Sequence, residues 1–203
     1  QEEGLLIIQL ERPDKKNALT GEMYTDLAEL FRQADADDDI HVVLIHGGED
    51  FCAGNDLQDF LQQPGDFLDS PAGNFLLTVA AFNKPLVAAV DGYAVGIGST
   101  LLLHCDLAYC SERATFSLPF VNLGLVPEFA ATLLLPNCAG YRLAAELLLL
   151  GEPFDAATAV RAGLVNAICT PEQLLDHSHS IALKLASKPQ LALQQTRALL
   201  HTV

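Results

Sequence analysis

Three short runs of consecutive apolar residues, each bordered by turn residues, predict β-strands. They are residues 5–10, 42–45 and 86–90; Gly47-Gly48 follows the second run and Lys84-Pro85 precedes the third. Strands whose apolar residues are continuous rather than alternating are covered on both faces, as in a parallel sheet. The pattern therefore predicts a sheet with helices packed on either side.

A helical period separates the first two runs. Apolar residues recur there at the spacing of one helix face, and Thr20 precedes them as a candidate N-cap, which predicts a helix over residues 21–34. The predicted apolar stripe consists of Met23, Leu27, Leu30, Phe31 and Ala34. Strands and helices in alternation are the order of an α/β domain.

After residue 140 the pattern is mainly helical. Helices are predicted over residues 141–150, 155–162, 171–187 and 189–201, with a short strand at 164–168. We therefore expect an α/β core in residues 1–140 and a helical carboxy-terminal region in residues 141–203. The polar stretch 59–73, which contains Pro64 and Pro71, is expected to be a loop or a mobile insertion.

Composition excludes several classes of protein. Half of the 203 residues are hydrophobic and 18% are charged, so the chain has material for a sizeable core and is not intrinsically disordered. The formal net charge of -15, without a basic patch, excludes nucleic acid as an expected partner. The apolar runs are much shorter than the roughly 18 residues of a membrane span, and no signal peptide is visible. A soluble, cytoplasmic protein that does not bind membranes is expected.

Cysteine and histidine spacing argues against a metal site. The cysteines are odd in number and irregularly spaced, which favours buried free thiols over disulfides or a zinc site. The histidines never take the HxxxH spacing that presents two ligands on one helical turn. We therefore expect no bound metal.

Two turns that follow strands share a physical logic. Small residues lead out of a strand in residues 51–57 (FCAGNDL), and a glycine-spaced turn in residues 91–99 (DGYAVGIGS) leads into a helix at 100–104. The amino terminus of a helix exposes N–H groups with a partial positive charge. Two such turns, converging from separate strands, would aim two N–H groups at one oxygen and form an oxyanion hole. From spacing alone, two purely structural turns remain the simpler interpretation.

Several ordered motifs resemble the crotonase superfamily, the enoyl-CoA hydratases and isomerases. They are FCAGNDL at 51–57, AAVDGYAVGIGSTLLLHCDLAY at 88–109 and FSLPFVNLGLVPE at 116–128, with RPDKKNAL at 12–19, GEPF at 151–154 and AGLV at 162–165. The resemblance implies a crotonase-like spiral of ββα units with a helical carboxy-terminal region. It also implies a homotrimer or a dimer of trimers. Compared with the family, this chain is expected to be shortened at its carboxy end and slightly short at its start.

The resemblance also assigns binding residues by position. The backbone N–H groups of Asn55 and Ile97 would form the oxyanion hole, with Ile97 replacing the middle glycine of the family's GGG. Ala53 corresponds to the position that receives the adenine ring of CoA. Lys15 and Lys16 would lie near the CoA phosphates, or else are solvated loop lysines. The CoA thioester is the substrate, so no separate cofactor is expected.

The carboxylates decide the expected reaction. Hydratases of this family use two glutamates, and the corresponding positions here are Thr100 and Phe120, neither of which can transfer a proton. A lone Glu128 remains, where Δ3,Δ2-enoyl-CoA isomerases of the peroxisomal type carry theirs. An apolar neighbourhood is expected to raise its pKa. The neighbourhood consists of Phe120, Val126, Phe129 and Ala130.

We therefore expect an acyl-CoA-processing enzyme, a Δ3,Δ2-enoyl-CoA isomerase with Glu128 as its base. The alternatives are hydratase-like, thioester-hydrolysing or dehalogenating chemistry on the same fold, or a catalytically silent acyl-CoA-binding subunit. Two further carboxylates are open to other interpretations. Asp56 is expected to be a helix cap or part of the pocket wall, and Asp106 a structural hydrogen-bond acceptor.

Overall fold

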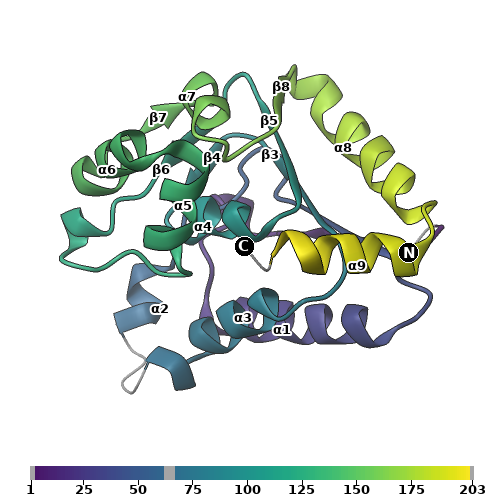
Figure 1. Cartoon of the computed structure of the whole chain (residues 1–203). Helices are drawn as coiled ribbons and strands as arrows, with labels where there is room; N and C mark the ends of the chain where they lie inside the picture. The colour runs from purple at the N-terminus through teal and green to yellow at the C-terminus, as the bar shows by residue number, and fades with distance from the viewer. Residues whose placement is uncertain (1–2, 62–66, 202–203) are drawn as a thin grey trace.

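A five-stranded parallel sheet with helices on both faces forms the centre of the molecule (Figure 1). The computed structural model describes residues 3–61 and 67–201. Within this part of the chain the sheet has the order β1-β2-β3-β5-β8. Its strands are β1 (Leu5–Gln9), β2 (Val42–His46), β3 (Leu86–Val90), β5 (Leu107–Ser111) and β8 (Ala167–Cys169). The three strands predicted from apolar runs are confirmed, and so is the mixed α/β architecture.

Alternate residues of the central strands face two different helical layers. In β2, Val43 and Ile45 belong to the core shared with α1 (Gly21–Ala36) and α3 (Pro71–Ala80), on the lower side of Figure 1. Val42 and Leu44 belong to the core under α8 (Pro171–Ala186), which lies along the other side of the sheet. All four side chains are fully buried, which explains why the run is continuously apolar.

Helix α1 begins where the sequence predicts, but its buried face is rotated. The Thr20 hydroxyl accepts a hydrogen bond from the N–H of Met23 at 3.3 Å and caps the helix. Tyr24 and Ala28 are buried, whereas Leu30 of the predicted stripe is exposed. The reason is that α1 packs against α3 as well as the sheet, and the rings of Tyr24 and Phe31 both lie against Phe75 of α3.

The loop predicted for residues 59–73 is wrong in its described parts, and residues 62–66, which include Pro64, lie outside the described residues. Helix α2 (Leu57–Leu61) extends into this segment from one side and α3 begins at Pro71 on the other. The Ser70 hydroxyl accepts from the N–H of Gly73 at 3.1 Å. Proline has no N–H to lose in the first turn of a helix, so Pro71 opens α3 instead of breaking it.

A small second sheet leads directly into the candidate site. Its strands are β4 (Tyr93–Val95), β6 (Thr115–Ser117) and β7 (Phe154–Asp155). Strand β4 ends at Val95, and Gly96 links it to α4 (Ile97–Thr100), which continues as the 3-10 helix η3 (Leu101–His104). The helix predicted over 100–104 therefore starts three residues earlier, which makes Ile97 its first residue.

The carboxy-terminal region contributes to both sheets, through β7 and β8, as well as supplying helices. Its helices are α6 (Tyr141–Leu150), α7 (Ala156–Arg161), α8 and α9 (Gln190–Leu200), preceded by α5 (Ala131–Ala139). The side chain of Asp155 accepts from the N–H of Thr158 at 2.8 Å and caps α7, as the sequence predicts. None of the helices in the described ranges is long and apolar enough to span a bilayer.

Candidate functional site

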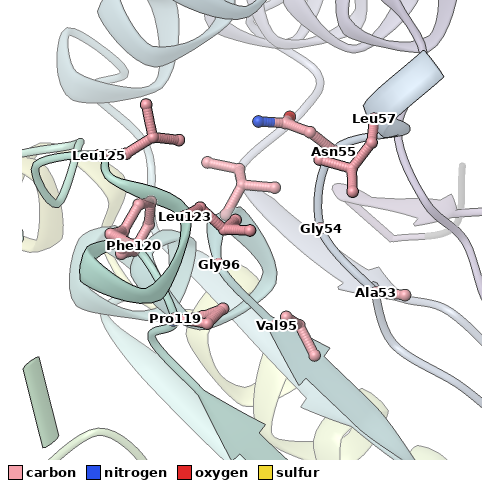
Figure 2. A pocket seen from close by; sticks show the side chains of 11 residues that line it. Ala53, Gly54, Asn55, Leu57, Val95, Gly96, Pro119, Phe120, Leu123 and Leu125 are labelled. Carbon is pink, nitrogen blue, oxygen red and sulfur yellow. The ribbon is translucent and has the colours of Figure 1, made fainter. Parts of the chain in front are cut away.

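A cavity of about 400 Å³ lies where the two glycine-containing turns meet (Figure 2). Its lining residues come from the segments 53–57, 95–97 and 119–125, which are far apart in the sequence. Among the described lining residues, Asn55 has the only polar side chain, and the others are glycine, alanine, proline, aliphatic residues and Phe120. The cavity therefore suits a largely apolar ligand with a small number of polar contacts.

The first turn places the backbone of Asn55 beside this cavity. The N–H of Leu19 donates to the carbonyl of Gly54 at 2.8 Å, and the N–H of Asp56 donates to the carbonyl of Leu19 at 2.9 Å. Because consecutive peptide groups of an extended segment point to opposite sides, the intervening N–H of Asn55 points away from Leu19. Within the described part of the chain, this N–H has no hydrogen-bond partner.

The second turn frees the N–H of Ile97. Gly96 has φ +54°, and its carbonyl accepts from the N–H groups of Ser99 and Thr100 at 2.9 Å each. As the first residue of α4, Ile97 has no residue four places earlier in the helix to receive its N–H. Ile97 is not among the residues with positive φ, so isoleucine is accommodated here without backbone strain, and its side chain packs into the main core.

The close contact between the two turns explains the glycine at position 98. A Cβ atom at Gly98 would lie 2.5 Å from the carbonyl oxygen of Cys52, so only glycine permits this approach. The N–H of Val95 also donates to the Cys52 carbonyl, at 2.9 Å. The structure thus brings Asn55 and Ile97 to one cavity, as an oxyanion hole requires.

Glu128 lies beside the same helix. Its Oε1 atom accepts from the hydroxyl of Thr100 at 3.4 Å, and Thr100 is three residues after Ile97 in α4. Burial of the carboxyl raises the pKa of Glu128 to about 7, against the opposing effect of the Thr100 hydrogen bond. A carboxyl with this pKa can both accept and donate a proton near neutral pH.

Tyr24 is a site residue that sequence reasoning missed. Its hydroxyl donates to Oδ1 of Asn55, and burial, followed by the charges of Cys52 and Glu128, raises the pKa of Tyr24 well above its ordinary value. Figure 2 shows the amide nitrogen of Asn55 directed across the cavity toward Leu125. The available signal in the sequence was its spacing, since Tyr24 stands three residues before Leu27 and seven before Phe31 of the predicted stripe.

Cys52 is close to the same carboxyl but stays protonated. Burial is the main reason that the pKa of its thiol is raised to about 12; the hydrogen bond from the backbone of Gly54 opposes the shift and the charge of Glu128 adds to it. Cys52 is therefore a packing residue at neutral pH. Of the other cysteines predicted to be buried, Cys110 is buried, Cys105 and Cys169 are partly buried, and Cys138 is exposed.

The apolar neighbourhood predicted around Glu128 is only partly correct. Phe120 and Phe129 are buried. Val126 is 81% exposed and Ala130 is also exposed, so neither shields the carboxyl. The chain changes direction directly after Glu128, because Phe129 and Ala130 both have left-handed backbone conformations.

The predicted CoA contacts lie on the outer side of the first turn. Ala53 lines the cavity, and its N–H donates to the carbonyl of Lys16 at 2.9 Å. The Nζ atom of Lys16 lies 3.7 Å from the centre of the Tyr93 ring. Lys15 and Lys16 are both exposed next to this segment.

Asp56 and Asp106 have structural contacts. Asp56 pairs with Arg12 at 2.8 Å and accepts from the backbone at the start of α2, so its helix-cap interpretation is confirmed; the hydrogen bond from Arg12 lowers its pKa. Asp106 accepts from the N–H of Leu86 and from the guanidinium of Arg197, each at 2.8 Å, which confirms it as a structural acceptor. No group of three or more potential metal ligands occurs within the ranges 3–61 and 67–201.

Comparison with known proteins gives consistent relationships. A family model described as enoyl-CoA hydratase/isomerase matches residues 1–203. The peroxisomal enoyl-CoA delta isomerase 3 of Mus musculus is 36% identical over 92% of this chain and 61% of its own length. The 2,3-dehydroadipyl-CoA hydratase of Escherichia coli K12 is 34% identical over 99% of this chain and 80% of its own length.

The fold is also found among solved structures. A protein from Magnetospirillum magneticum AMB-1, described as a candidate enoyl-CoA hydratase/carnithine racemase, superposes with a TM-score of 0.96 and 50% identity. The superposition covers 98% of this chain and 79% of that one. These values confirm the crotonase-like fold implied by the sequence motifs, whereas the relatives' names include both isomerases and hydratases.

Proposed function

This chain belongs to the enoyl-CoA hydratase/isomerase family, and we propose that it is a Δ3,Δ2-enoyl-CoA isomerase. One observation carries the proposal: two unengaged backbone N–H groups line a cavity beside one carboxyl whose pKa is about 7. Glu128 contacts the end of α4 through Thr100, and none of the described lining residues of the cavity carries a carboxyl. One base and one oxyanion hole are the minimum that a double-bond shift next to a thioester requires.

The reaction needs only one proton to move. The thioester acidifies the C2 hydrogens of a 3-enoyl chain, and the carboxylate of Glu128 removes one of them. The electron pair delocalises over C2, C4 and the thioester oxygen, and the N–H groups of Asn55 and Ile97 stabilise the negative oxygen. Glu128 then returns the proton to C4, so the double bond moves from C3–C4 to C2–C3 and the base is regenerated.

The residues at the hydratase positions support this choice over hydration. Thr100 donates its hydroxyl to Glu128, and Phe120 forms part of the apolar wall. This family's two-glutamate mechanism for adding water to a 2-enoyl thioester requires a second carboxyl. That carboxyl positions the water or protonates the substrate carbon. With threonine and phenylalanine in those places, water lacks its second proton-transfer partner.

The lining also limits the acyl group. The relative from Escherichia coli is named for dehydroadipyl-CoA, whose acyl chain has a free carboxylate at the end away from the thioester. No cationic side chain occurs among the described lining residues of the present cavity. An uncharged hydrocarbon chain therefore fits this lining better than a dicarboxylic chain, because burying an unpaired carboxylate is strongly unfavourable.

The test is an absorbance assay with a straight-chain 3-enoyl-CoA. The proposal predicts accumulation of the conjugated 2-enoyl-CoA, with little addition of water to crotonyl-CoA. Robust hydration of crotonyl-CoA would instead support a hydratase. Release of free CoA thiol would support thioester hydrolysis, and acyl-CoA binding without turnover would support a silent binding subunit.

A further inference from the structure

We propose that His104 is a positioning residue whose ring N–H holds the backbone carbonyl of Phe129 and thereby places Glu128. Its Nε2 atom lies 2.9 Å from the carbonyl oxygen of Phe129. The imidazole also stacks on the Phe129 ring, with centroids 3.6 Å apart and an angle of 17° between the planes. A carbonyl can only accept, so this contact requires a proton on Nε2.

The segment held by His104 has an unusual backbone. Phe129 and Ala130, the two residues after Glu128, have φ values of +54° and +53°. Side chains with a Cβ atom are unfavourable in this left-handed region, and such conformations persist where surrounding contacts fix them. His104 fixes the first of the two residues through both its ring and its N–H.

The carboxyl of Glu128 itself is weakly held. Its hydrogen bond from Thr100 is 3.4 Å long, which is beyond the range of a strong hydroxyl–carboxylate bond. The backbone therefore decides where the carboxyl lies. The N–H of Ala131 closes this turn by donating to the carbonyl of Glu128 at 2.9 Å.

One short helical stretch connects His104 to the rest of the site. Ile97 begins α4, Thr100 ends it, and His104 ends the 3-10 helix that follows without a break. The same stretch therefore supplies an oxyanion donor, contacts the carboxyl and holds the residue after it. The Nε2 atom of His104 is engaged with the Phe129 carbonyl, so His104 acts through the position of Glu128.

Paired variants separate the N–H of His104 from its ring. His104→Phe keeps an aromatic ring on Phe129 but removes the donor, whereas His104→Gln keeps an N–H donor without the ring. We expect His104→Phe to lower kcat for the isomerase reaction by about 10-fold or more with KM changed less than about 3-fold, because small displacements of a reacting group are costly. His104→Gln should recover most of the loss.

His177→Phe is the matched control. His177 contacts Tyr109 edge to face, with centroids 4.7 Å apart, and Tyr109 belongs to the core on the opposite face of the sheet. The same substitution there should leave kcat unchanged. A parent-like kcat in His104→Phe, or equal losses in His104→Phe and His104→Gln, would overturn the positioning role.

A second readout does not depend on turnover, although the first rests on the proposed isomerase activity. Carbon-13 NMR of protein with labelled glutamate side chains can follow the titration of the Glu128 carboxyl. The Glu128 resonance is identified as the one that is missing in Glu128→Gln. Tyr24, Cys52 and Thr100 face this carboxyl and are the same in every variant. We expect the Glu128 carboxyl to titrate near pH 7 in the parent. In His104→Phe its titration should shift toward the ordinary range of glutamate, and in His104→Gln it should return toward that of the parent.

The two readouts distinguish the two proposals. Shifted titration in His104→Phe together with an inactive parent would support the positioning role and overturn the isomerase assignment. Turnover by the parent, together with unshifted titration and unchanged kcat in His104→Phe, would support the isomerase assignment and overturn the positioning role. The melting temperature of each variant establishes that the compared proteins are folded.

Discussion

At the scale of single residues, one carboxyl of the candidate site, that of Glu128, is suited to proton transfer near neutral pH. Tyr24 and Cys52 lie near Glu128, but burial raises the pKa of both groups, so both stay protonated at neutral pH. Asp56 is ionised and bound to Arg12. Of these four groups, Glu128 combines proximity to α4 with a pKa of about 7.

Substitution of Glu128 tests directly whether its carboxyl is the group that transfers the proton. Glu128→Gln keeps the size and polarity of the side chain but cannot accept the C2 proton, so turnover of a 3-enoyl-CoA should fall by roughly 10³-fold or more. Affinity for the CoA ester, measured by calorimetry, should change by less than about tenfold. Asp56→Asn is the matched carboxylate control and should retain turnover; near-normal rates in Glu128→Gln would show that the base lies elsewhere.

The raised pKa of Glu128 predicts a specific pH profile. The base must be ionised to remove a proton, so kcat/KM should fall as the pH drops through about 7. An unperturbed glutamate would place this acidic limb between about pH 4 and 5. A profile that stays flat down to pH 5 in stopped-flow assays would contradict burial of the reacting carboxyl.

The same shift has a consequence for stability. Because folding raises this pKa from 4.5 to about 7, the folded state binds more protons than the unfolded state between these values, and stability falls as the pH rises through them. Glu128→Gln removes the buried charge. After allowance for partial exposure, it should raise the free energy of unfolding at pH 8 by about 1–3 kcal/mol and change it little at pH 4. Urea unfolding at the two pH values measures the difference.

At the scale of elements, the α4–η3 stretch organises the site. Its first N–H is free because Ile97 begins the helix directly after Gly96, and its second residue is glycine because Cys52 approaches too closely for a side chain. Thr100 and His104 then contact Glu128 and the residue after it. An error in the start of this helix would displace both the donor and the base.

Ile97 offers a direct test of this element. Proline is tolerated at the first position of a helix and removes the N–H together with part of the buried side chain, so Ile97→Pro should lower turnover by about 10²–10³-fold with Glu128 intact. Ile97→Val trims the buried side chain but keeps the N–H, and therefore separates packing from donation. Equal turnover in the two variants would show that the Ile97 N–H does not stabilise the reacting oxygen.

At the scale of the whole molecule, assembly is the open expectation. Large apolar side chains are exposed in the segment 125–150, among them Leu133, Tyr141 and Leu149. Helix α9 packs against the rest of the same chain through Arg197, whose guanidinium donates hydrogen bonds to Asp106 and to the carbonyl of Phe82. We predict trimers or dimers of trimers, with masses in multiples of three times the 21.8 kDa chain. Light scattering that shows a stable monomer would contradict this prediction.

The sequence by itself determined the elements whose signals are local. Continuous apolar runs identified β1, β2 and β3, and the caps Thr20 and Asp155 correctly marked the starts of α1 and α7. The motifs also singled out Asn55, Ile97 and Glu128, whose catalytic roles remain predictions. The prolines led to an incorrect loop prediction for residues 59–73, because the effect of a proline depends on whether it lies inside a helix or in the first turn of a helix.

Only the tertiary structure decided how the site is held together. The bonds of Tyr24 to Asn55, of Thr100 to Glu128 and of His104 to Phe129 join residues 31, 28 and 25 positions apart. Nor does any local pattern show that Val126 is exposed while Glu128 is buried enough for its pKa to rise. Propensity and periodicity act over a few neighbouring residues, whereas burial and hydrogen bonding between distant segments depend on how the whole chain packs.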